Sequence, residues 1–144
     1  MASVFDVAKY ILEKTGQMTA MKLQKLVYYS QAWSLVWDEE PIFNERIEAW
    51  ANGPVCPDLY KEHRGMFHVN PSSIFYGDSS NLTKKQTETI DSILEYYGSK
   101  TSQWLSDLTH KEEPWKNARI GYEPGEICSE EISQASMAEY YGSL

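Results

Sequence analysis

The sequence predicts an α+β fold: a single, mostly helical domain over residues 1–144, with a central buried helix and a small antiparallel sheet of two or three strands. Three observations lead to this class. Apolar residues recur at helical spacing in several segments that are bounded by capping residues. The second half of segment 20–37 is apolar almost all round, which is typical of a helix surrounded by others. Residues 43–52 alternate instead with the two-residue period of a strand.

The first half of the chain predicts two helices, over residues 4–14 and 20–37. Ser3, three residues before Asp6, is a start signal for the first helix, and Gly16 ends it. Thr19 can cap the second, which the acidic run 38–40 and Pro41 terminate. One face of this second helix carries a stripe at helical spacing: Leu23, Leu26, Val27, Ser30, Trp33 and Trp37.

The alternating strand over residues 43–52 follows, and Gly53 with Pro54 is expected to stop it, because proline cannot donate to a ladder. Pro57 then opens a short helix that closes at Gly65. Residues 73–77, Ser-Ile-Phe-Tyr-Gly, are predicted to form a second strand.

The second half is predicted to be helical. Thr83 forms a capping box with Gln86 and opens a helix that Gly98 ends. A further helix carries Trp104, Leu105 and Leu108. Pro114 occupies a first helical position, where its missing N–H costs nothing. Ser129, followed by two glutamates, is expected to open a last helix through Ile132, Met137 and Tyr140.

Charge argues against a nucleic-acid binder. The chain has 21 acidic and 13 basic residues, a formal net charge of -8, and its lysines are scattered in ones and twos. Phosphate backbones attract clustered basic residues, so we do not expect direct DNA binding. The 144 residues also leave no room for an added DNA-binding region, so we do not expect self-repression at an operator. An acidic surface suits a basic protein partner.

The cysteines and the apolar segments indicate a cytoplasmic protein. Cys56 and Cys128 belong to no metal-binding spacing and are expected to be reduced thiols. No basic segment at the amino terminus leads into an apolar run, so no signal peptide is visible. The apolar-leaning segment 26–37 is too short and too polar to cross a bilayer, so we expect no membrane association.

Five motifs occur in a fixed order along the chain: Lys22–Tyr29, Ile47–Trp50, Gly53–Val55 with Leu59–Tyr60, Leu108–His110, and Pro114–Trp115 with Ala118–Arg119. Together they resemble the Panacea domain of SocA-like and GepA-like antitoxins, often encoded beside a toxin and often on prophages. The resemblance spans nearly the whole chain and implies a mostly helical fold that neutralises a toxin by direct protein contact. Toxins paired with this domain are unrelated to one another, so the partner stays unnamed. The resemblance implies an aliphatic residue at position 56, so Cys56 departs from the family pattern.

The candidate partner-binding residues are Tyr28, Trp50, Gly53, Pro54, Tyr60, His110 and Trp115. Aromatic side chains beside a rigid turn can anchor a partner. Core packing is the alternative for three of them: around the sheet for Trp50 and Tyr60, and on the central helix for Tyr28. His110 can equally be a structural histidine at a helix end.

A catalytic role is the alternative to partner binding. His110 titrates near neutrality and could act as a general base in a small hydrolase or nuclease, and His63 and His68 could join a metal site. No HExxH or GxSxG pattern is present, so we assign no catalytic residue, metal or cofactor. The sequence predicts an antitoxin that binds a toxin encoded by an adjacent gene. An adaptor that hands the toxin to a cytosolic protease is the alternative.

Overall fold

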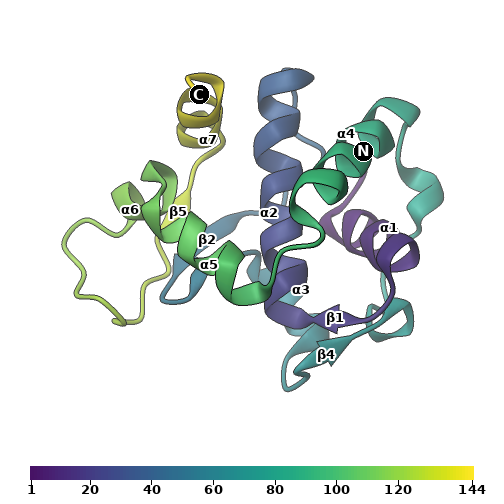
Figure 1. Cartoon of the computed structure of the whole chain (residues 1–144), viewed down its shortest axis with the longest axis horizontal. Helices are drawn as coiled ribbons and strands as arrows, with labels where there is room; N and C mark the ends of the chain where they lie inside the picture. Colours follow the sequence, from purple (N-terminus) through teal and green to yellow (C-terminus); the bar gives the residue numbers. More distant parts are fainter.

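The computed structural model describes residues 1–144, and helix α2 (Ala20–Trp37) runs through its centre (Figure 1). The Thr19 hydroxyl accepts a hydrogen bond from the N–H of Lys22 and so caps the helix start. Twelve of the 18 residues of α2 are buried, including Lys25 and Gln31. The prediction of a central buried helix is confirmed.

Other helices cover α2 from both sides. In Figure 1, α1 (Val4–Thr15) and α4 (Lys84–Tyr97) lie to its right, and α5 (Ser102–Lys111), α6 (Glu113–Ala118) and α7 (Gln134–Gly142) lie to its left or in front. Reciprocal capping boxes start α1 and α4, as predicted. A continuous cluster of 31 buried apolar residues joins the elements. None of the helices has the length and apolar character required to span a membrane.

Two small antiparallel sheets complete the α+β fold, which confirms the predicted class. The larger has the order β3 (Gly53–Val55), β2 (Ile47–Trp50), β5 (Glu131–Ile132), and the smaller pairs β1 (Met18–Thr19) with β4 (His68–Val69). The remaining elements are α3 (Pro57–His63) and the short 3-10 helices η1 (Pro71–Ser73) and η2 (Ser79–Asn81).

The predicted strand over residues 43–52 is shorter than expected, and Gly53 with Pro54 does not stop it. Gly53 pairs with Trp50 and Pro54 with Ala49, so β2 and β3 form a hairpin. Proline is tolerated in β3 because β3 is an edge strand, where one side needs no N–H donor. Phe43 is buried but lies outside any strand, and its carbonyl accepts a hydrogen bond from the Gln31 side chain at 2.7 Å in place of a ladder partner.

Two further expectations are wrong. Residues 73–77 form no strand: the Lys9 ammonium donates to the carbonyls of Pro71 and Ile74 and holds this segment against α1. The last helix begins after Ser133 rather than at Ser129. Residues 131–132 instead form strand β5, where Ile132 is buried opposite Ile47.

Candidate partner-binding surface

A surface groove of about 480 Å³ opens beside the β2–β3 hairpin. We call it the hairpin groove, and its lining includes Met21, Glu48, Trp50, Tyr60, Ile127 and Cys128. Trp50 and Tyr60 come from β2 and α3, and their rings meet edge to face with centroids 4.9 Å apart. Both side chains are half-buried. Two of the predicted residues therefore lie together on one surface, each with part of its ring open to a partner.

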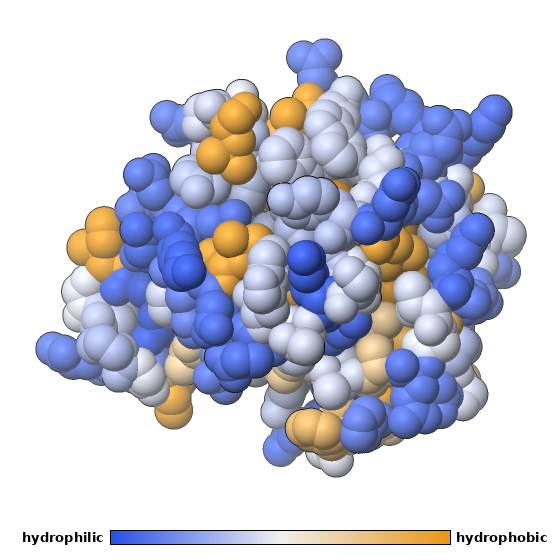
Figure 2. All heavy atoms as spheres, viewed as in Figure 1, coloured by the Kyte–Doolittle hydropathy of each residue, from blue (hydrophilic) through white to orange (hydrophobic).

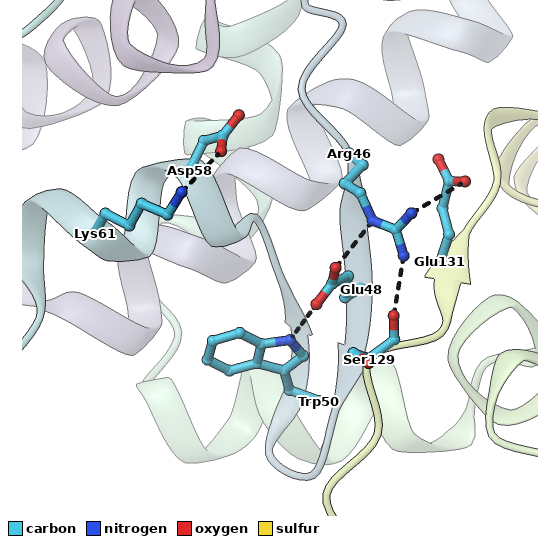
Figure 3. Close-up of polar contacts among 7 residues, drawn as sticks. All are labelled: Arg46, Glu48, Trp50, Asp58, Lys61, Ser129 and Glu131. Carbon is cyan, nitrogen blue, oxygen red and sulfur yellow. Dashed lines mark hydrogen bonds and ion pairs between the residues drawn. The ribbon is translucent and has the colours of Figure 1, made fainter.

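Polar contacts fix the orientation of the Trp50 indole (Figure 3). Its Nε1–H donates to Glu48 at 2.9 Å, and the other oxygen of Glu48 accepts from Arg46 Nε at 2.9 Å. Arg46 also donates to the carbonyl of Ser129 and lies 3.9 Å from the Glu131 carboxylate. The half-exposed Arg46 contributes little stability through such ion pairs. These contacts connect β2 to the segment around β5 and hold the Trp50 indole in one orientation.

A second cluster supports the hairpin from behind. The Trp115 Nε1–H donates to the carbonyl of Trp50 at 2.8 Å. The His110 ring stacks on Trp115 at 4.2 Å between centroids, and the Arg119 guanidinium lies 5.2 Å from the same ring. Arg119 is buried and donates to the carbonyl of Ala49 at 2.8 Å. Trp115 and His110 therefore position the backbone of the groove rather than line it.

His110 has the surroundings of a packed, neutral imidazole. Burial lowers its pKa, and the positive charges of Lys25 and Arg119 lower it further, against an opposing effect of Asp107. Its Nε2 is buried and has no hydrogen-bond partner. His110 does not line the hairpin groove.

The three histidines are not brought together. His63 is buried and its Nε2 lies 2.9 Å from the Gln24 side-chain nitrogen, whereas His68 is exposed on β4 and His110 lies on α5. No group of three or more His, Cys, Asp or Glu side chains is placed to hold a metal ion. The geometry thus offers no assembled centre for the hydrolase or nuclease alternative.

Gly53 and Pro54 surround a buried lysine. Gly53 has φ +121°, and a Cβ at this position would lie 2.5 Å from Lys25 Cε. The Lys25 ammonium donates to the carbonyl of Pro54 over a long 3.4 Å contact. Because the side chain is fully buried, the pKa of Lys25 is lowered to about 7. Glycine is required here because only it combines this φ with the space that the lysine occupies.

A larger groove, of about 780 Å³, lies between the ends of α2, α4 and α5. We call it the aromatic groove, and its lining includes Trp33, Trp37, Tyr96, Tyr97, Trp104 and Glu112. The face shown in Figure 2 has pale spheres with a few orange ones in its upper middle, where the ends of α2 and α4 lie in Figure 1, and blue regions on both sides. Trp37 was predicted on the core face of its helix, but its side chain is 51% exposed.

Comparison with known families decides the affiliation. The model of the antitoxin SocA-like, Panacea domain family matches residues 23–116, which run from Leu23 in α2 through the hairpin to Lys116 in α6. The chain belongs to this family. Comparisons with curated proteins and with solved structures gave no match. The family supports an antitoxin role and implies a toxin as partner.

The Panacea chain separates the predicted residues into three environments. Trp50 and Tyr60 line the hairpin groove, and Trp115 with His110 supports it from behind. Tyr28 is 2% exposed, and its hydroxyl lies 3.0 Å from that of Tyr141. Gly53 and Pro54 are buried around the Lys25 side chain. A role for any of the seven in partner binding stays a prediction, and for the buried ones it would act through the shape of the domain.

Sequence reasoning missed the aromatic groove of this Panacea domain. Its signal was present: Trp33 and Trp37 are four residues apart on α2, and Tyr96 and Tyr97 end α4. The helical spacing was interpreted as a core stripe, but Trp37 is the last residue of α2 and its side chain is exposed. Leu144, at the carboxyl end, completes the wall.

Proposed function

We propose that this protein is an antitoxin that neutralises its cognate toxin by binding it directly, with the hairpin groove as the contact surface. The match of residues 23–116 to the SocA-like Panacea family carries the proposal. The groove supports it, because oriented aromatic anchors with a polar rim are the usual composition of an energetically dominant patch at a protein interface. Neutralisation would follow from covering the toxin's active or target-binding surface.

The proposal treats residues 1–144 as one Panacea-like domain without enzymatic activity, cofactor or metal. An antitoxin must meet its toxin where the toxin is made, so we propose a cytoplasmic location and a toxin gene adjacent to that of the antitoxin. We propose no direct contact with DNA. The net charge of -8 would accelerate association with a basic toxin, and that acceleration would weaken as salt is added.

Co-expression with the product of the neighbouring open reading frame tests the proposal. The toxin alone should arrest growth, and the antitoxin should restore growth and copurify with it. Trp50→Ala should weaken binding about 30-fold, equivalent to ~2 kcal/mol, because it removes the central anchor. Tyr60→Ala provides a second variant on a different element. Phe75→Ala is the matched control, since Phe75 is 82% exposed and lines neither groove.

The outcomes separate the parts of the proposal. Growth arrest that persists with the unmodified antitoxin, without copurification, would refute the antitoxin role for that gene pair. Rescue that both Trp50→Ala and Tyr60→Ala leave intact, in variants with unchanged thermal unfolding, would exclude the hairpin groove as the contact. Toxin abundance distinguishes the protease-adaptor alternative: occlusion leaves the toxin present in a complex, whereas an adaptor makes it disappear from protease-competent cells.

A further inference from the structure

The aromatic groove presents ring faces that are held in fixed orientations. Trp33 and Trp37 stack with centroids 5.1 Å apart, and the Trp33 Nε1–H donates to the Tyr97 hydroxyl at 3.2 Å. Tyr96 contacts Tyr97 edge to face at 4.6 Å. Trp104 adds a further ring from α5, and its side chain is 41% exposed. Rings in such positions offer electron-rich faces to a ligand without the entropy cost of ordering them.

A carboxylate lies among these rings. Glu112 lines the groove although it is only 6% exposed. Its Oε1 accepts hydrogen bonds from the hydroxyls of Tyr29 and Tyr141, each at 2.7 Å. Its Oε2 accepts no hydrogen bond. This oxygen is in contact with solvent, because the one side-chain nitrogen or oxygen that is both fully buried and unpaired is His110 Nε2. One oxygen of a nearly buried carboxylate is therefore free to accept a donor.

The charge of the groove is unbalanced. Burial raises the pKa of Glu112, although the hydrogen bonds from Tyr29 and Tyr141 oppose that shift, so the ionised carboxylate is destabilised in the empty groove. A cation beside it would stabilise the ionised form. No lysine or arginine lines the groove. The Lys100 ammonium lies 4.8 Å from the centre of the Trp104 ring, so one of these rings already contacts a cation of the chain itself. A desolvated carboxylate beside aromatic faces is complementary to a cation.

We propose that the aromatic groove binds an arginine side chain of a partner protein, with the guanidinium against the tryptophan rings and donating to Oε2 of Glu112. Arginine fits better than lysine because its planar group stacks on aromatic faces and donates in a fixed direction. The volume of about 780 Å³ exceeds one side chain, so apolar neighbours of the arginine would fill the remainder. That the partner is the toxin rests on the proposed function, whereas the preference of the groove for arginine does not.

Binding of short peptides to the isolated full-length protein tests the proposal. The probes are acetyl-Leu-Arg-Leu-amide and the same peptide with citrulline, the uncharged isostere of arginine. Titration calorimetry gives the affinity, and tryptophan fluorescence reports on the site because Trp33, Trp37 and Trp104 lie in it. We expect the arginine peptide to bind about tenfold more tightly, and Glu112→Gln, which keeps an acceptor for the tyrosines, to remove most of that difference.

Two further variants keep the result interpretable. Trp37→Ala should weaken both peptides, and because its side chain is half-exposed at the helix end, the fold should survive. Phe75→Ala, an exposed aromatic outside the groove, should change neither affinity. Equal affinity for the arginine and citrulline peptides, or a difference that Glu112→Gln leaves intact, would overturn the proposal. Failure of toxin rescue alone would leave it standing, since no toxin is present in this assay.

Discussion

Replacing Lys25 with methionine is expected to remove a pH-dependent cost from the folded state. The lysine side chain is fully buried, and its ammonium makes only the 3.4 Å hydrogen bond to Pro54. Burial lowers the pKa of Lys25 from 10.5 to about 7. The Lys25 amine therefore binds a proton more tightly in the unfolded chain than in the folded chain. At neutral pH, folding must release this proton or bury the charged ammonium, and either costs free energy.

The sign and size of the effect follow from the two pKa values. Between pH 7 and pH 10.5 the unfolded state is protonated at Lys25 and the folded state is not, so wild-type stability rises with pH. The slope is about 1.4 kcal/mol per pH unit, and the whole window amounts to about 5 kcal/mol. Methionine has no proton to bind. The free energy of unfolding of Lys25→Met, minus that of the wild type, should fall by about 2 to 3 kcal/mol between about pH 7.5 and about pH 9.5.

Urea unfolding followed by tryptophan fluorescence at several pH values measures this difference. Comparing the two proteins cancels other ionisations, such as that of the Cys56 thiol, whose pKa burial raises to about 12. Lys84→Met, at a side chain that is 91% exposed, is the matched control and should run parallel to the wild type. A difference between Lys25→Met and wild type that stays constant across the window would refute the argument from burial.

Three other predictions concern folding and binding. Gly77→Ala should cost about 3 kcal/mol of stability in thermal unfolding, since φ is +99° and the added Cβ would lie 2.6 Å from the backbone of α1. Gly16→Ala should cost less, about 2 kcal/mol, because the Cβ would meet open space and only the strain of φ 81° and ψ -162° opposes it. Gln31→Leu should cost about 3 kcal/mol in urea unfolding, because buried backbone groups of residues 42–43 lose their partners. Ile127→Ser should weaken toxin binding about tenfold in calorimetry at unchanged stability, whereas Ile120→Ser, in the same loop but outside the hairpin groove, should change neither.

Local signals in the sequence were sufficient for most of the helices. Ser3 with Asp6 and Thr83 with Gln86 specify helix starts through hydrogen bonds between residues three apart, so the pattern can be read without the fold. The segment 73–77 could not be read in this way. Its conformation depends on Lys9, more than sixty residues earlier, whose ammonium binds two of the carbonyls around it. Strand propensity was overridden by a contact that has no local signature.

Some residues of the candidate site could likewise be predicted from local sequence, and others could not. Trp50 and Tyr60 could be selected because they flank a turn, and the hairpin places their rings together. The exposure of Trp37 could not be predicted, because helical spacing defines a face of α2 but not how far the neighbouring helices extend along it. Glu112 was missed for a related reason: it lies between two short helices in sequence, and only the fold brings Tyr29 and Tyr141 to its carboxylate.

The two grooves extend beyond the segment that matches the family, which suggests how partner specificity can vary. Residues 23–116 include α2, whose buried Gln24, Lys25 and Gln31 hold the loops and the hairpin by hydrogen bonds. These motif positions act on the shape of the domain. Residues beyond the match complete each groove, however, among them Ile127 at the hairpin groove and Leu144 at the aromatic groove. Both side chains are more than two-thirds exposed, so substitution there alters the contact surface with little effect on the core. A scaffold of this kind can keep its fold while its partner changes, and the place to look for that change is the segment after residue 116.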